Sequence, residues 1–139
     1  MILENSKIID APLQSVWAIT RDVTTWPEWT PTVTQILRLD DAPLATGSVV
    51  IIKQPGMSAK EWCVTEFWDG RGFTWETDER AIHMSATHEL IGVDSGTKST
   101  LRLRISGCLA MLLWPLIYNS ARKNLELENI GLKMRCEAE

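Results

Sequence analysis

A long amphipathic segment at the end of the chain limits the possible folds more than any other pattern in the sequence. On a helical wheel of about 100° per residue, most apolar side chains after Cys108 gather on one side, and Arg122 and Asn129 lie on the other. The predicted buried stripe consists of Leu109, Leu112, Leu113, Leu116, Ser120, Leu127, Ile130 and Met134. A helix of about 30 residues is about 45 Å long and cannot bury such a stripe alone. We therefore predict that it lies on the concave face of a twisted sheet, with a kink or its true start at Pro115.

The middle of the chain carries the pattern of that sheet. Between Thr32 and Ser106 the hydrophobic period changes to two, which is typical of β-strands, and turn residues interrupt it at short intervals. With a first strand from near Leu3 to Ile9, the predicted strands cover residues 33–40, 48–54, 60–68, 72–78, 82–91 and 98–106. No helical pattern separates the later strands. The spacing therefore indicates an antiparallel meander rather than a parallel sheet with crossover helices.

Two short helices are expected between the first strand and the meander. Ala11-Pro12 opens the first helix, because proline is favoured at the first helical position. Asp22 is a suitable cap for the second helix, and Pro27 should limit its length. The segment from Trp26 to Pro31 is then predicted to be a stiff loop that carries two indoles.

Composition excludes several classes of protein. The chain has 139 residues and a formal net charge of −4, which predicts one domain over residues 1–139 and argues against a nucleic-acid partner. The three cysteines lack the spacing of a zinc site, and their odd number fits a reducing compartment. No signal peptide and no apolar run of about 20 residues is seen, so we expect a cytoplasmic protein without an integral membrane segment.

Several short segments, in this order along the chain, carry a family resemblance. The most specific are Ala11-Pro12 with Val16-Trp17, then Trp26-Pro27-Glu28-Trp29, and then Gln54-Pro55-Gly56. Followed by the strands and the last helix, they resemble the polyketide cyclase/dehydrase branch of the START-like (Bet v 1-like, SRPBCC) superfamily. The resemblance implies an α+β helix-grip fold, in which a curved seven-stranded antiparallel sheet wraps around a long C-terminal helix. It also implies an elongated apolar cavity for lipids, polyketides or sterols, and it implies no shared catalytic residue.

Strand parity indicates which side chains face that cavity. Leu90 and Leu101 are natural inward residues, so His88 and Leu103 should point inward with them. The predicted cavity lining, with the side chains contributed by the last helix, is Ile52, Gln54, Trp62, Phe73, Trp75, Met84, His88, Leu103, Leu116 and Ser120. Trp62 and Trp75 are read as cavity walls or as core. Trp26 and Trp29 are expected at the cavity mouth, as a gate or as a plug that holds the short helices down.

His88 is the candidate for chemistry in this cavity. It is either a polar handle or general acid–base, or an interior histidine bonded to a backbone carbonyl or to Gln54. Glu66 has inward parity and could pair with an interior cation, although a solvated position fits it better. His83 lies on the opposite face from His88, which argues against a paired metal site. No metal, cofactor or hydrolase motif is predicted.

Three functions remain open at this point. The first is non-catalytic binding, transport or sequestration of a small hydrophobic molecule such as a lipid, polyketide or isoprenoid. The second is an aromatase/cyclase-like enzyme that positions a polyketide and transfers protons. The third is an interaction module of the co-chaperone or quinone-chaperone type. A second apolar surface on the last helix could pack internally, form a homodimer or touch a membrane, and it comprises Met111, Trp114, Tyr118, Leu125 and Leu132. The chain is thus expected to be a monomer or homodimer.

Overall fold

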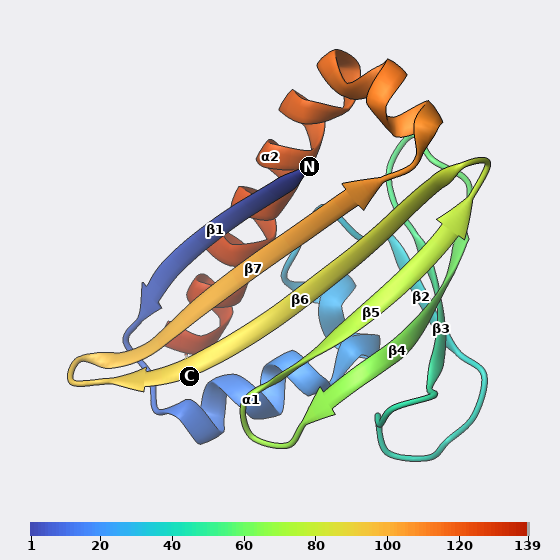
Figure 1. Cartoon of the computed structure of the whole chain (residues 1–139). Helices are drawn as coiled ribbons and strands as arrows, with labels where there is room; N and C mark the ends of the chain where they lie inside the picture. Colours follow the sequence, from blue (N-terminus) through green and yellow to red (C-terminus); the bar gives the residue numbers. More distant parts are fainter. Residues whose placement is uncertain (139) are drawn as a thin grey trace.

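A seven-stranded antiparallel sheet, seen in a computed structural model that describes residues 1–138, is the frame of the fold. The strands are β1 (Ile2–Ile9), β2 (Gln35–Arg38), β3 (Val49–Lys53), β4 (Lys60–Trp68), β5 (Gly72–Glu79), β6 (Ile82–Val93) and β7 (Gly96–Ser106). They lie side by side in the order β1-β7-β6-β5-β4-β3-β2, so β1 and β2 are the edges. The sheet curves strongly from β7 to β3 (Figure 1). The predicted strands and the antiparallel meander are confirmed, with β2 shorter than predicted.

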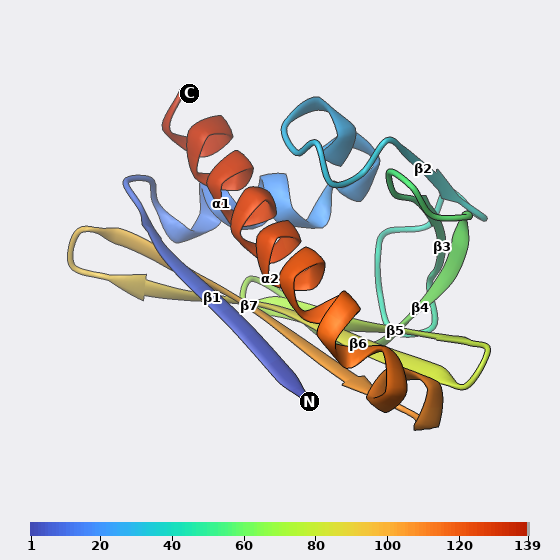
Figure 2. The same cartoon turned by 90° about the horizontal axis from the view of Figure 1, so that it is seen from above.

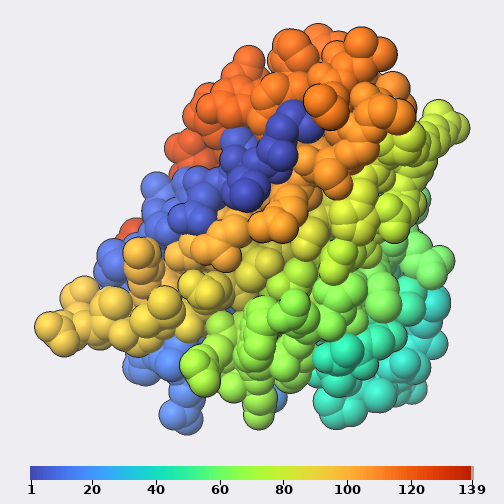
Figure 3. Space-filling model, in the orientation of Figure 1, coloured from blue at the N-terminus to red at the C-terminus, as the bar shows by residue number. Residues whose placement is uncertain are grey.

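The helices cover the concave face of this sheet. They are α1 (Leu13–Arg21), the 3-10 helix η1 (Val23–Glu28) and α2 (Cys108–Glu137). Figure 2 shows α2 lying across β1 and β7, with α1 and η1 beside it. Figure 3 shows the opposite, convex side, where the strands form the surface and the first half of α2 projects past β7. This is the helix-grip arrangement expected from the sequence.

The turn after α1 differs from the prediction in one respect. Pro27 lies inside η1 instead of ending it, so the indole of Trp26 projects from a helical turn and not from a loop. A short 3-10 helix tolerates the missing N–H of proline near its end. The backbone N–H groups of Trp29 and Thr30 both donate to the carbonyl of Trp26 just beyond it.

The side chains on the inner face of the sheet are those predicted from strand parity, with one exception. Trp62, Trp75 and Leu101 are all buried on that face. A β-bulge after Val64 shifts the register in β4. As a result Phe67 packs against the core, while Glu66 is exposed despite its inward parity and takes the solvated position that fitted it better.

The side of α2 that faces the sheet is not the predicted stripe. Leu112 and Leu116 are each 76% exposed and Met134 is 67% exposed. The buried side chains are instead Ala110, Leu125, Asn129, Leu132 and Cys136, together with Gly131. Leu125 and Leu132, which were assigned to a second apolar surface, therefore belong to the interior, while Met111 and Tyr118 are exposed and Trp114 is half-buried.

The buried side of α2 is rotated about the helix axis relative to the predicted stripe. One polar residue and one small residue explain this rotation. Asn129 is fully buried because its side-chain nitrogen donates to the Asn5 side chain at 2.9 Å and to the Ser99 carbonyl at 3.0 Å. Gly131 lets the helix approach η1 so closely that a Cβ there would lie 2.1 Å from the Trp29 carbonyl oxygen. Pro115 lies inside α2, and Figure 1 shows the first turns of α2 at an angle to the rest. The helix is therefore anchored at its C-terminal half and diverges from the sheet at its start.

Candidate functional site: an apolar cavity between helix α2 and the sheet

A cavity of about 310 Å³ lies where the first half of α2 diverges from the concave face of the sheet. Its walls come from β3 to β7, from η1 and from α2, and they are predominantly apolar. An apolar cavity of about 150 Å³ is large enough to hold benzene. The space here is about twice that size, which suits a two-ring molecule or a chain of similar bulk.

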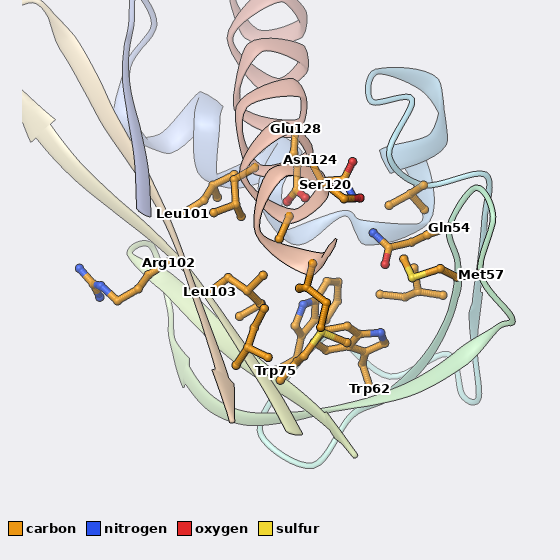
Figure 4. A pocket seen from close by; sticks show the side chains of 18 of the residues that line it. Gln54, Met57, Trp62, Trp75, Leu101, Arg102, Leu103, Ser120, Asn124 and Glu128 are labelled. Carbon is orange, nitrogen blue, oxygen red and sulfur yellow. The ribbon is translucent and has the colours of Figure 1, made fainter. Parts of the chain in front are cut away.

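Most residues predicted to line the cavity do line it. The sheet contributes Ile52 and Gln54 near the end of β3, Trp62, Trp75, Met84, His88 and Leu103. Helix α2 contributes Leu116 and Ser120. Figure 4 shows Trp62 and Trp75 on one side of the space and Ser120 on the other. Strand parity was sufficient to find the sheet side, because a buried neighbour fixes the direction of every second side chain.

Three predicted positions need correction. Phe73 is fully buried and stacks on His88 with ring centroids 4.7 Å apart, so it belongs to the core behind the cavity wall. Trp26 does line the cavity, but at 2% exposure it belongs to the interior and not to an open mouth. Its indole N–H donates to the Thr20 carbonyl at 3.0 Å. Trp29 does not line the cavity and packs against Trp26 with centroids 5.3 Å apart.

His88 is the most enclosed titratable group of the cavity wall. Its side chain is 7% exposed, and its Nε2 lies 3.1 Å from Oε1 of Glu128 on α2. The imidazole is also in edge contact with Trp26 and Trp75, at centroid distances of 5.1 and 5.4 Å. The partner of His88 is therefore Glu128, and neither Gln54 nor a backbone carbonyl takes that place.

Glu128 and Asn124 are cavity residues that the sequence analysis missed. They follow Ser120 at intervals of four, and that spacing places the three side chains on one face of a helix. The signal was present, because Ser120 was already in the predicted stripe, but the stripe was defined by its apolar residues and was not extended to Asn124 and Glu128. Figure 4 shows Ser120, Asn124 and Glu128 together along the α2 side of the cavity.

Positive charge is directed away from the cavity. Arg102 borders the space, but its side chain points outward (Figure 4), where its Nε donates to Glu4 at 2.8 Å. Within residues 1–138, no group of three or more His, Cys, Asp and Glu side chains is placed to hold a metal ion. In the same range, no helix is long and apolar enough to cross a membrane.

Sequence comparison identifies a family for almost the whole chain. The model of the family described as polyketide cyclase / dehydrase and lipid transport matches residues 2–128. That range includes every strand and the cavity-lining part of α2. No curated protein sequence matches the chain.

Solved structures of low sequence identity share the fold. A hypothetical protein from Helicobacter pylori superposes with a TM-score of 0.85 at 16% identity, covering 98% of this chain and 88% of that one. A START superfamily protein from Mycobacterium smegmatis gives 0.81 at 14% identity, with 99% and 97% covered. The ZhuI aromatase/cyclase from a Streptomyces strain gives 0.75 at 15% identity, with 99% and 93% covered.

Proposed function

The chain belongs to the polyketide cyclase/dehydrase and lipid transport family, and from this premise we propose that it binds a small hydrophobic molecule in the cavity beside α2. The family spans both transport and catalysis, so the cavity itself must indicate which role the chain has. Its walls offer many apolar side chains and few polar ones, a ratio that favours binding over turnover.

The observation that supports this proposal best is the size and lining of the cavity. Trp62 and Trp75 present large aromatic side chains to it, and Met84 and Leu103 extend the apolar wall. An apolar guest gains about 25 cal/mol for each Å² of its surface removed from water. A guest that buries about 200 Å² of apolar surface would thus gain about 5 kcal/mol before the cost of association is subtracted.

A fluorescence titration tests the proposal. N-phenyl-1-naphthylamine is dark in water and emits in apolar surroundings, and its absorption overlaps tryptophan emission. We expect saturable probe emission at a ratio of one probe per chain, with energy transfer from the tryptophans of the cavity wall. Emission that rises linearly without saturation, or only above the solubility limit of the probe, would refute binding in the cavity.

The pair formed by His88 and Glu128 supports an aromatase/cyclase-type activity as a second candidate. A carboxylate that accepts from one imidazole nitrogen orients the ring for proton transfer. If the cavity catalyses enolisation, the chain should speed exchange of the α-protons of a small cyclic 1,3-diketone with D₂O, followed by NMR. His88→Gln should then lose this acceleration. Equal exchange rates with and without the protein would exclude this activity for diketones of that size.

A further inference from the structure

Helix α2 contributes a row of polar side chains to the cavity wall, and Gln54 adds an uncharged amide from the end of β3. Ser120, Asn124 and Glu128 line the α2 side, whereas Trp62 and Trp75 lie opposite (Figure 4). A cavity that is apolar at one end and polar at the other accommodates a molecule with the same division. The charge at the polar end then decides which polar groups such a molecule can carry.

That charge comes from Glu128. Its side chain is 15% exposed, and its Oε1 is held by Nε2 of His88, while no protein group within the described residues is bonded to Oε2. The pair carries one negative charge when the imidazole is neutral and none when it is protonated. In neither state does it offer a surplus of positive charge to an anion.

No other lining residue supplies a cation. Arg102 is the only arginine or lysine on the described cavity wall, and its guanidinium is directed to Glu4 on the convex side. A carboxylate or phosphate at the polar end would therefore face Glu128 without a counter-charge. Juxtaposed like charges in a desolvated site cost several kcal/mol.

We propose that the molecule bound by this cavity ends in an uncharged hydrogen-bond donor, such as a hydroxyl group, and that fatty acids and other anionic lipids are rejected. This inference rests on the proposed binding function and narrows its ligand class. The hydroxyl donates to the free oxygen of Glu128, and the apolar part of the molecule lies against Trp62 and Trp75.

Three matched naphthalenes test the ligand class. They share one ring system and differ in the side chain: 2-naphthaleneethanol, 2-naphthaleneacetate and 2-ethylnaphthalene. Each is titrated against the wild-type chain by displacement of N-phenyl-1-naphthylamine. We expect the alcohol to bind at least about tenfold more tightly than the carboxylate, because only the carboxylate faces Glu128 as a like charge.

Two glutamate variants show whether Glu128 causes the discrimination. Glu128→Gln keeps an oxygen for His88 but removes the charge, so the preference for the alcohol over the carboxylate should fall severalfold. Glu126→Gln is the matched control, because Glu126 lies two residues earlier on α2 and does not line the cavity. The Glu126→Gln chain should prefer the alcohol over the carboxylate as strongly as the wild-type chain does.

The outcomes separate this inference from the proposed function. If 2-ethylnaphthalene binds and the carboxylate binds as tightly as the alcohol, the inference is wrong while cavity binding stands. The wild-type comparison decides this even where Glu128→Gln fails to fold. An unchanged preference in folded Glu128→Gln also overturns the inference. If none of the three molecules displaces the bound probe, the inference is refuted, whereas the proposed function is refuted only if the probe itself does not bind saturably.

Discussion

A bulky side chain placed on α2 to fill part of the cavity should remove most of the affinity of the chain for a hydrophobic ligand. It should leave the fold undisturbed. Ser120 suits this purpose, because it lines the cavity but is exposed on α2 at the edge of the space. In Ser120→Trp, the indole can turn into the cavity and cover part of the apolar wall. A small exposed residue is replaced, so no core contact is lost.

The expected magnitude follows from the area that the new indole covers. A tryptophan side chain buries 150–250 Å² when enclosed, and about 100 Å² of that would replace ligand contact. At about 25 cal/mol per Å² the ligand loses about 2.5 kcal/mol, which weakens its Kd about 70-fold. The free energy of unfolding should change by less than about 0.5 kcal/mol, as is usual for exposed positions.

Asn119→Trp is the matched control for this experiment. Asn119 is exposed on the same turn of α2 and does not line the cavity, so the same indole there points away from the space. Titration with N-phenyl-1-naphthylamine should give wild-type affinity for Asn119→Trp and strongly reduced affinity for Ser120→Trp. Equal affinities for the two variants would show that the probe binds elsewhere and that the reasoning is wrong.

Three further predictions concern the anchoring of α2 and the convex face. Asn129→Ala should lower the free energy of unfolding by about 3 kcal/mol, because it leaves the Asn5 side-chain oxygen and the Ser99 carbonyl without this donor. Denaturant titration will measure the loss. Gly131→Ala should also destabilise the chain despite a helix-propensity gain of about 1 kcal/mol, because the new Cβ collides with the Trp29 carbonyl; an increased melting temperature would contradict this. The hydrogen bond that the His83 imidazole donates to the Asp78 carboxylate raises the pKa of His83 above 6.5. The stabilisation from this bond is therefore complete below pH 6.5 and disappears as the pH rises through the raised pKa. The melting temperature of His83→Gln should therefore fall below that of the wild type by more at pH 5.5 than at pH 8.5.

The sheet was predictable from the sequence because its signal is local. Alternation places Trp62, Trp75, Leu101 and Leu103 on one face, and a strand has only two faces to choose between. A single bulge at Val64 was enough to reverse the direction of the residues that follow it in β4. A bulge leaves no reliable mark in the sequence, so alternation alone could not give the directions of Glu66 and Phe67.

The rotation of α2 was not predictable from hydrophobicity alone. The richest leucine face includes Leu112 and Leu116, yet both are exposed, because the start of the helix diverges from the sheet. Asn129 looks like a surface residue on the wheel and is fully buried, because Asn5 and Ser99 accept its hydrogen bonds. Those partners lie far away in the sequence, and a wheel contains no information about them.

The same limitation applied to the cavity. His88 was placed on its wall from parity, but its partner Glu128 depended on the rotation of α2. Once the rotation is known, the spacing of Ser120, Asn124 and Glu128 explains the polar side of the cavity. Local pattern thus located the apolar wall, and only the packing of distant segments located the polar one.

The position of a bound guest can be measured by NMR, as nuclear Overhauser effects between unlabelled 2-ethylnaphthalene and the isotopically labelled chain. A guest between α2 and the sheet should give cross-peaks to the indole protons of Trp62 and Trp75 and to the methyl group of Met84. Cross-peaks confined to exposed side chains such as Met111 and Leu112 would place the guest outside the cavity and contradict the account.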